Sequence, residues 1–551
     1  MTTTKCAVIG LDGATFDLIL PMVEAGELPT LGRLLNDGSW GTLRSTILPN
    51  SFPGWASATT GTSEGMHGIF SPFLKRREEY GVRAISAVDL QTRPIWDLLN
   101  AQGYSTGIIN IPTTYPVEKV TGYQITGMLT PSTKSPFTYP PSLQAELLEH
   151  LPNYIIEPRR ALGRAEKAAE FRNCLEGHVQ AAEYLIQTRP TDFLMIVLSV
   201  PDRAQHDFWA DMDSAHFRYD PVQSPEYSEF IREIYRQADA GVERILRQLP
   251  DDVTVVICSD HGFSAELREL RVNEWLAQRG FLRYQPEAFR TASTTLDKIS
   301  NKLTYHYRAL STKLKPHSVL EKKVVFGRDF LNQIDWEHTT AFFGQDKGVW
   351  INLKGRDRAG TVEPQDFERV RSEVIQALNE WIDPETGECV FEAVVPREAT
   401  LTGRFADRLP DILVIPQRSE DVPIETASPG APIVPATTTT GTHAPDGILL
   451  MAGPHIRKNH QLTGANLRDI TPTALFALGA ALTQDMDGQP LLDAFTSEFT
   501  RANPIRRQGT SYKDGLTGGS NPSVSSSSTE VFSDEEASEL EERLRALGYL
   551  G

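Results

Sequence analysis

Cysteine, net positive charge and long hydrophobic runs are all scarce in this chain of 551 residues. Its four cysteines, Cys6, Cys174, Cys258 and Cys389, lack the spacing of a cysteine metal site, so we expect buried thiols in a reducing compartment. The net charge of −18 argues against nucleic acid as a partner, because binding to its backbone requires a basic surface. The longest apolar run, Phe193 to Val200, is too short to span a bilayer, which takes roughly 20 residues.

Aspartate and histidine side chains in four short segments are the most informative feature that is present. Three of these segments directly follow apolar, β-branched runs that are typical of buried parallel strands: Lys5 to Leu11, Phe193 to Val200 and Val253 to Cys258. Ligands of open α/β sheets bind beyond the carboxyl ends of such strands. If the side chains converge there, they supply oxygen and nitrogen ligands for two divalent metal ions, zinc or manganese. The residues are Asp12, Asp202, His206, Asp260, His261 and His443.

Each of these residues also has a simpler interpretation. Asp12 follows a strand, where an aspartate often caps a helix. Asp202 and His206 stand four residues apart and would also fit a surface pair on one helical face. The segment from Asp260 to Gly262 would fit an ordinary turn, and His443 by itself would fit a structural role. Their joint occurrence favours the metal site, because two metal ions about 4 Å apart promote in-line displacement at phosphorus.

A further segment supplies a nucleophile. It contains a serine in a turn before a predicted helix, followed by Thr60-Gly61 and by His67-Gly68-Ile69. With these motifs the chain resembles the alkaline phosphatase superfamily, in particular its type I phosphodiesterase and nucleotide pyrophosphatase branch. The stretches Gly10 to Thr15 and Asp202 to His206 are similar to a bacterial and archaeal subgroup of predicted phosphohydrolases or phosphomutases. The resemblance covers roughly residues 5 to 495, and the nucleophile segment reads Leu48-Pro49-Asn50-Ser51-Phe52-Pro53-Gly54-Trp55.

The resemblance implies a role for each of these residues. Ser51 is the nucleophile, and coordination to a metal lowers the pKa of its hydroxyl group. The helix that follows turns its N–H groups and the positive end of its dipole toward the phosphate. The implied cycle is attack by Ser51, a phosphoseryl enzyme and hydrolysis by water, although Ser51 would also fit a plain N-cap. One metal is held by Asp202, His206 and His443, and the other by Asp12, Asp260, His261 and the oxygen of Ser51.

The chain also departs from relatives of this superfamily. Nucleotide pyrophosphatases usually have an asparagine a few residues past H-G-I, where this chain has Phe70-Ser71-Pro72. Asn50 is therefore a predicted substrate-binding residue, or it serves the turn. Trp55 stands where those enzymes often have a polar residue, and it also replaces the arginine that sulfatase maturation requires. Phosphoglycerate mutase-like enzymes carry a large inserted basic domain that has no match here.

Alternating strands and helices predict an α/β fold, an alkaline phosphatase-like sandwich whose central, mainly parallel sheet is flanked by helices. Residues 1–500 would form this catalytic domain, with inserted cap elements at about 113–164 and 265–340. We expect a helix from Phe367 to Trp381, a core strand from Asp411 to Ile415 and a final helix from Leu467 to Leu478. A flexible, Gly- and Ser-rich linker would follow at 501–533.

Residues 534–551 are predicted to form a short acidic C-terminal helix with Leu540, Leu544 and Leu547 on one face. This helix would dock either on the catalytic domain or on a partner protein. The insertion at 265–340 contains a helix from Val272 to Gly280 and a basic stretch from Lys298 to Arg328. That stretch would be a solvated helical face, a lid that recognises a second anionic group of the substrate, or an amphipathic surface for anionic lipid.

The leading functional prediction is a two-metal phosphohydrolase that cleaves phosphate monoesters or diesters through a phosphoseryl intermediate on Ser51. The alternatives are a phosphoryl or phosphoalcohol transferase or phosphomutase that uses the same site, and a catalytically silent binding protein. The substrate would be a small phosphate ester or a lipid headgroup. Three imidazoles favour zinc, and the carboxylates also accept manganese. Cleavage of a signal peptide would remove Asp12, so we expect a cytoplasmic protein.

Overall fold

The computed structural model describes residues 3–75, 80–158, 162–286, 332–426 and 429–513 and, near the C-terminus, 531–533, 535–537, 540 and 544. The basic stretch from Lys298 to Arg328 lies outside these residues, so its three interpretations stay predictions. Within the described residues, every helix is too short or too polar to cross a membrane.

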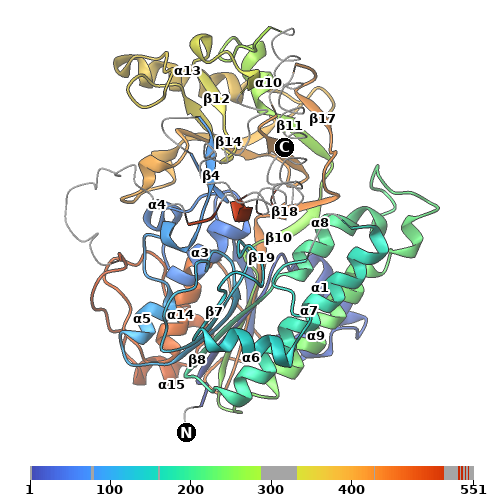
Figure 1. Ribbon diagram of the computed structural model, residues 1–551, viewed down its shortest axis with the longest axis vertical. Helices are drawn as coiled ribbons and strands as arrows, with labels where there is room; N and C mark the ends of the chain where they lie inside the picture. The colour runs from blue at the N-terminus through green and yellow to red at the C-terminus, as the bar shows by residue number, and fades with distance from the viewer. Residues whose placement is uncertain are drawn as a thin grey trace, which may run out of the picture.

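The centre of the molecule is a ten-stranded sheet whose middle is parallel (Figure 1). Strand β1 (Cys6–Leu11) pairs in parallel with β8 (Phe193–Leu198) and with β9 (Thr254–Cys258). On the far side of β8 the parallel pairing continues through β5 (Thr106–Ile111) to β6 (Gly122–Thr126). The apolar runs at β1, β8 and β9 are buried along their whole length, as expected for parallel strands covered on both faces.

The two edges of the sheet are mixed. On one edge, β7 (Thr138–Tyr139) runs antiparallel to β6. On the other, β19 (Asp446–Ala452) lies antiparallel between β9 and β2 (Ser39–Arg44), and the short strands β20 (His460–Gln461) and β21 (Ala465–Asn466) pair with β2. The order is β20-β2-β19-β9-β1-β8-β5-β6-β7, with β21 beside β2. Strand β19, which comes late in the chain, therefore joins β2 to β9, which both come much earlier in the sequence.

Helices cover both faces of this sheet (Figure 1). Because side chains alternate along a strand, Ala7 and Ile9 of β1 enter one core, and Cys6 and Val8 enter the other. The first core is completed by α1 (Phe16–Glu24), α2 (Pro29–Asp37), α6 (Ser142–His150), α7 (Arg164–Thr188), α8 (Val200–Met212) and α9 (Phe230–Leu246). The second contains α3 (Ser51–Thr60), α5 (Ile95–Asn100), α14 (Ile470–Ala477) and, at its rim, α15 (Ser497–Ala502).

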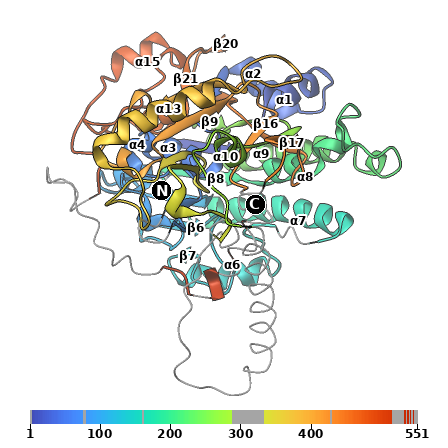
Figure 2. The ribbon, with the colours of Figure 1, turned by 90° about the horizontal axis from the view of Figure 1, so that it is seen from above.

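A second layer of structure, here called the cap, lies at one end of the sheet (Figures 1 and 2). Its four-stranded antiparallel sheet has the order β12 (Ala341–Phe343), β13 (Val349–Ile351), β15 (Ile412–Pro416) and β14 (Phe391–Pro396). Helices α10 (Val272–Gln278) and α13 (Phe367–Asn379) share a hydrophobic core with it. A three-stranded sheet has the order β16 (Asp421–Ile424), β11 (Arg268–Arg271) and β17 (Ile433–Pro435).

Short elements connect the cap to the catalytic layer. Strand β10 (Gly262–Ala265), which follows β9, pairs with β18 (Gly441–Ala444), which precedes β19. The hairpin of β3 (Phe73–Lys75) and β4 (Val82–Ala84) follows the short helix α4 (Glu64–His67). The chain thus leaves the central sheet after β9 and returns to it through β18 and β19.

The mainly parallel sheet flanked by helices confirms the predicted fold class. Two organisational details differ. The strand predicted as core at Asp411 to Ile415 is β15 of the cap, because its apolar pattern does not distinguish one buried sheet from another. The stretch at 113–164 contributes β6, β7 and α6 to the central layer rather than a separate cap element.

The end of the chain packs on the catalytic layer. Residues at the start of the expected linker are ordered by backbone hydrogen bonds, with Arg93 N donating to Ser511 O at 2.6 Å. Residues 514–530 lie outside the described part. Further on, Glu536 Oε1 accepts a hydrogen bond from Ser135 Oγ at 2.7 Å, and Leu540 and Leu544 are buried in a cluster that includes Phe52 of α3. The described part of the C-terminal segment therefore docks within its own chain.

Candidate metal and phosphoryl-transfer site

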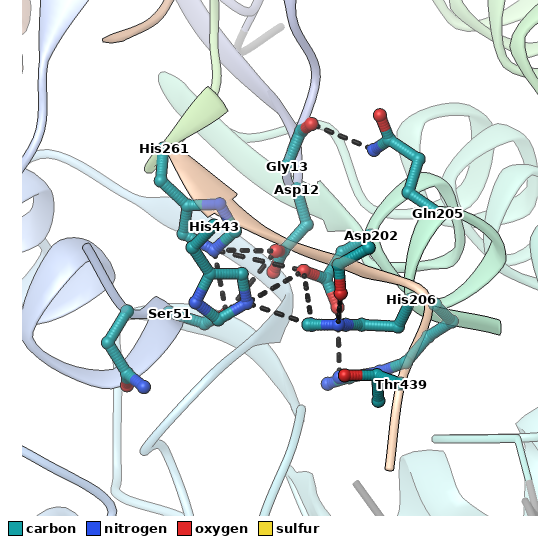
Figure 3. Close-up of polar contacts among 12 residues, drawn as sticks. Asp12, Gly13, Ser51, Asp202, Gln205, His206, His261, Thr439 and His443 are labelled. Carbon is teal, nitrogen blue, oxygen red and sulfur yellow. Dashed lines mark hydrogen bonds and ion pairs between the residues drawn. The ribbon is translucent and has the colours of Figure 1, made fainter. Parts of the chain in front are cut away.

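The predicted site residues come together at the carboxyl ends of the central strands (Figure 3). Asp12 follows β1 directly, and Asp202 and His206 lie one turn apart on α8, which begins as β8 ends. Asp260 and His261 occupy the turn between β9 and β10, and His443 lies on β18. Pairing of β10 with β18 places Phe263 opposite His443, so His443 lies beside the turn after β9.

Ser51 is the first residue of α3 and is fully buried. Its Oγ lies 3.3 Å from Asp12 Oδ1 and 3.3 Å from Nε2 of His261. The N-cap of α3 is Asn50, whose Oδ1 accepts a hydrogen bond from Phe52 N at 3.1 Å. The capping role is therefore taken by Asn50, and the Ser51 hydroxyl is directed at the carboxylate and imidazole groups.

Asp202, His206 and His443 form the first group of potential metal ligands, with one ligand atom from each within 4.8 Å of the others. Asp202 Oδ1 lies 3.4 Å from Nε2 of His206 and 3.2 Å from Nε2 of His443. The two imidazole Nε2 atoms are 2.9 Å apart. This is the set that the resemblance implies for one metal.

The second group consists of Asp12, Asp202 and His261. His261 Nε2 lies 3.8 Å from Oδ1 of Asp12 and 3.8 Å from Oδ1 of Asp202. The resemblance implies Asp260 rather than Asp202 for this metal. Asp260 is also at hand, since its Oδ2 lies 3.1 Å from Nε2 of His261. Asp202 thus lies between the two groups, and Oδ1 of its carboxylate faces both.

A backbone carbonyl group holds each of the three imidazole rings in a single orientation. In each, Nδ1 lies within hydrogen-bond distance of a backbone carbonyl: His206 with Gly441 O at 2.8 Å, His261 with Gly262 O at 3.0 Å and His443 with Pro49 O at 3.1 Å. A carbonyl only accepts, so Nδ1 carries the proton in the neutral ring and Nε2 presents a lone pair. Metal-ligating histidines show this arrangement, which orients the ring and fixes the tautomer.

The unpaired atoms of the site fit a cation. Among the described residues, Asp202 Oδ1 and Asp260 Oδ2 are buried and accept no hydrogen bond. Two lone pairs also face each other across 2.9 Å at His206 and His443. Buried acceptors without a donor are costly, at about 1–3 kcal/mol each. A divalent ion bound by these oxygen and nitrogen atoms would satisfy all of them.

The charges of the site lead to the same conclusion. Burial, and then the charges of Asp260 and Asp202, raise the pKa of Asp12 well above its usual value. Burial and the charge of Asp202 raise the pKa of Asp260 to about 7. Burial also opposes ionisation of Asp202, yet His206 and Arg203 hold its pKa well below the usual range. Positive charge is in short supply among these carboxyl groups, and divalent ions would supply it.

Comparison with protein families gives an independent result. The model of the type I phosphodiesterase / nucleotide pyrophosphatase family matches residues 6–446, which include every residue of the site. The chain belongs to this family. The predicted family is thereby confirmed, and the protein is an enzyme that hydrolyses phosphoric esters. No curated protein matches the chain significantly.

The chain is similar to solved structures of two other proteins. Phosphonoacetate hydrolase from Sinorhizobium meliloti 1021 has 14% identity and a TM-score of 0.50, and the match covers 87% of this chain and 96% of that one. Human ectonucleotide pyrophosphatase / phosphodiesterase 5 has 12% identity and a TM-score of 0.49, with 90% and 100% covered. At such identities the similarity to phosphonoacetate hydrolase shows the fold alone.

In this type I phosphodiesterase family member, Trp55 has a role that its sequence position did not reveal. Its Nε1 donates to Asp12 Oδ2 at 3.0 Å, which leaves Oδ1 of Asp12 facing Ser51. The indole ring lies against Gly10 of β1, where an added Cβ would approach Trp55 Cη2 to 2.3 Å. A glycine at position 10 is therefore required for the ring that orients Asp12.

The histidine of the H-G-I motif, His67, supports α3, the helix that begins at Ser51. Nδ1 of His67 accepts from Ile69 N at 3.1 Å, and its Nε2 lies 3.0 Å from Ser57 Oγ on α3. Burial lowers the pKa of His67 to about 3, so the ring is neutral. His67 therefore ties the turn after α4 to the helix that carries Ser51.

Arg203 also escaped prediction. It is fully buried behind the site, where Nη1 donates to Asp202 Oδ2 at 2.9 Å and Nε lies 3.4 Å from Glu157 Oε2. The second oxygen of Asp202 is thus taken by a cation, and the first is left to face the imidazoles. No spacing rule links residue 203 to Glu157, because the pair arises only from the packing of α8 on the loop after α6.

Replacement of Arg203 by methionine is expected to weaken metal binding and destabilise the fold. It would leave two buried carboxylates without their counter-charge, a change that costs about 3–5 kcal/mol. Denaturant unfolding measures the stability, and titration of the folded protein with zinc measures the affinity. Arg203→Lys keeps the charge and should recover part of both. Unchanged zinc affinity in folded Arg203→Met would show that Asp202 does not depend on this contact.

A cleft of about 400 Å³ opens beside the metal ligands. Asn50, His206 and His443 line its catalytic side. The opposite wall belongs to the cap and includes β16, two residues of β11 and the segment that follows β17. The cleft therefore lies between the candidate metal ligands and the cap.

Proposed function

We propose that the protein is a two-metal phosphohydrolase that cleaves phosphate monoesters or diesters through a phosphoseryl intermediate on Ser51. One observation supports this above the others: the hydroxyl of Ser51 lies 3.3 Å from Oδ1 of Asp12 and 3.3 Å from Nε2 of His261, within a shell of six ligands. Asp202, His206 and His443 would hold one ion, and Asp12, Asp260, His261 and Ser51 the other. Three imidazoles favour zinc, with manganese as the alternative.

The residues divide the chemistry among them. Ser51 Oγ attacks phosphorus, the Oγ–P bond forms, and the bond from phosphorus to the alcohol oxygen breaks. The alcohol leaves with the proton that the Ser51 hydroxyl gives up. The Ser51 hydroxyl donates to Asp12 Oδ1 before reaction. When bound, the metal ions would lower the pKa of the hydroxyl group and neutralise the charge on the phosphoryl oxygens. Attack by water then breaks the Oγ–P bond and regenerates the serine.

The substrate would be bound by residues at the rim of the site. Asn50 Oδ1 is committed to the helix cap, whereas its Nδ2 makes no hydrogen bond within the described residues. We assign this amide to a phosphoryl oxygen, beside the N-terminus of α3. The cleft of about 400 Å³ would receive the alcohol portion, from a small phosphate ester or a lipid headgroup.

The domain limits and the location are part of the proposal. The catalytic unit would comprise the central layer and the cap, up to about residue 500, with the C-terminal helix at 534–551 as an accessory segment. Cys6, Cys174 and Cys258 are free and buried, and Cys389 is free and exposed. An exposed free thiol is most stable in a reducing compartment, which supports the cytoplasm.

The direct test is hydrolysis of p-nitrophenyl phosphate and bis-p-nitrophenyl phosphate by protein stripped with chelator and reloaded with zinc or manganese. We expect activity to disappear on chelation and to return with metal, and the preferred ester separates monoesterase from diesterase. Failure of both esters with two metals bound would contradict hydrolysis of simple esters. It would favour transfer of the phosphoryl group to a specific acceptor alcohol.

A further inference from the structure

The cap side of the cleft contains several charged side chains. Its buried carboxyl groups are each matched by a donor within the cap. Thr439 Oγ1 donates to Glu266, and Thr437 donates to Glu269 through N at 2.8 Å and Oγ1 at 2.6 Å. Asp421 is held by Arg268 at 2.7 Å, and Glu425 by Lys347 at 2.7 Å.

The cations of the cleft are also paired, with one exception. Lys347 is bound to Glu425, Arg44 lies 3.0 Å from Asp446, and Arg418 lies 3.8 Å from Glu420. Arg271 differs: within the described residues its guanidinium forms no ion pair, and its Nε is buried without a hydrogen-bond partner. It is therefore the cation of this wall whose binding capacity is unused.

The backbone holds Arg271 in place. It is the last residue of β11, which is the central strand between β16 and β17. Leu270 points into the core of the cap, and its neighbours Glu269 and Arg271 line the cleft. The strand is therefore fixed on both sides, and the side chain faces the same space as Asn50, His206 and His443.

A buried donor without a partner is costly, and this cost needs a compensating partner. A guanidinium presents a planar fork of donors that suits carboxylate and phosphate oxygens. We propose that Arg271 binds a second anionic group, a phosphate or a carboxylate, on the alcohol portion of the substrate. The proposal rests on the proposed function, because it places the phosphate under attack at Ser51 and the rest of the substrate in the cleft.

The test uses ligands that cannot be hydrolysed. Zinc-loaded protein is titrated calorimetrically with alkylphosphonates of increasing chain length, with the matching carboxyalkylphosphonates and with the matching bisphosphonates. At the chain length that spans the cleft, we expect the second anion to tighten binding by about 10- to 100-fold, the effect of one charge-assisted hydrogen-bond pair. Comparison of the carboxylate and bisphosphonate series shows which anion is preferred.

Arg271→Met should abolish this preference and leave the affinity for simple alkylphosphonates unchanged, and Arg271→Lys should retain part of it. Arg418→Met is the matched control, since Arg418 lines the same cleft but lies near Glu420, and the preference should persist. An equal preference in wild type and Arg271→Met, or none at any chain length, would overturn the proposal. A preference that depends on Arg271 in protein that hydrolyses no ester would instead contradict the phosphohydrolase function alone.

Discussion

Ser51→Ala is expected to lower the turnover of phosphate esters by about 10³-fold or more, while the metal content stays near that of the wild type. In the proposed mechanism the Ser51 oxygen forms the covalent bond, and a nucleophile acts as a unit with its activating groups. The proposed ions would keep all of their carboxylate and imidazole ligands. Steady-state kinetics and elemental analysis of the purified variant provide the two measurements.

Ser57→Ala is the matched control on the same helix. Ser57 lies 3.0 Å from His67 Nε2 and makes no contact with the metal ligands, so its loss should cost about 1 kcal/mol of stability and little activity. Unchanged turnover in Ser51→Ala would remove Ser51 from its role. Loss of metal in that variant would make the serine a structural ligand rather than a nucleophile.

Asp202→Asn is expected to lose both metal ions together with activity. Oδ1 of Asp202 belongs to both ligand groups, so this single carboxylate connects them. An amide has no charge to offer and is a weaker ligand, and Arg203 would be left facing a neutral group. We expect the variant to bind metal about 10-fold or more weakly, so that its metal content falls below half of the wild-type value. Elemental analysis after dialysis measures this content.

Asp207→Asn is the control for this variant, because Asp207 lies on the same helix and pairs with Lys167 at 3.3 Å away from the ligand groups. Its metal content should remain full. If Asp202→Asn retained both ions, the carboxylate would not be shared. If it lost only one, the ion that remains would identify the group in which Asp202 is dispensable.

The convergence of the six candidate ligands was predictable because each follows a recognisable strand or lies in a short motif. Asp12 comes directly after an apolar run, and the spacing of Asp202 and His206 is one helical turn. Parallel strands bring such positions to one edge of the sheet. The sharing of Asp202 between the two groups was not predictable, since it depends on the distances among side chains from three different elements.

The residues that support the site could not be found in this way. Trp55 reaches Asp12 only because Gly10 leaves space for its ring, and Arg203 reaches Glu157 only across a packed interface. Likewise, the run from Asp411 to Ile415 was recognised as a strand but assigned to the wrong layer. Local patterns determine the type of an element, whereas its neighbours follow from the global topology.

The position of β19 has a consequence for the order of folding. This strand lies between β2 and β9, so residues 39–44 join the sheet only after residues 446–452 have arrived. Contacts of such long sequence separation form slowly, because closing the intervening loop is entropically costly. His443 enters on β18, directly before β19. A chain that has formed only its early strands thus contains Asp12, Asp202 and His261 but lacks the last ligand of the other group. If the site binds two metal ions as proposed, complete metal uptake would therefore mark the moment at which β19 has joined β2 to β9.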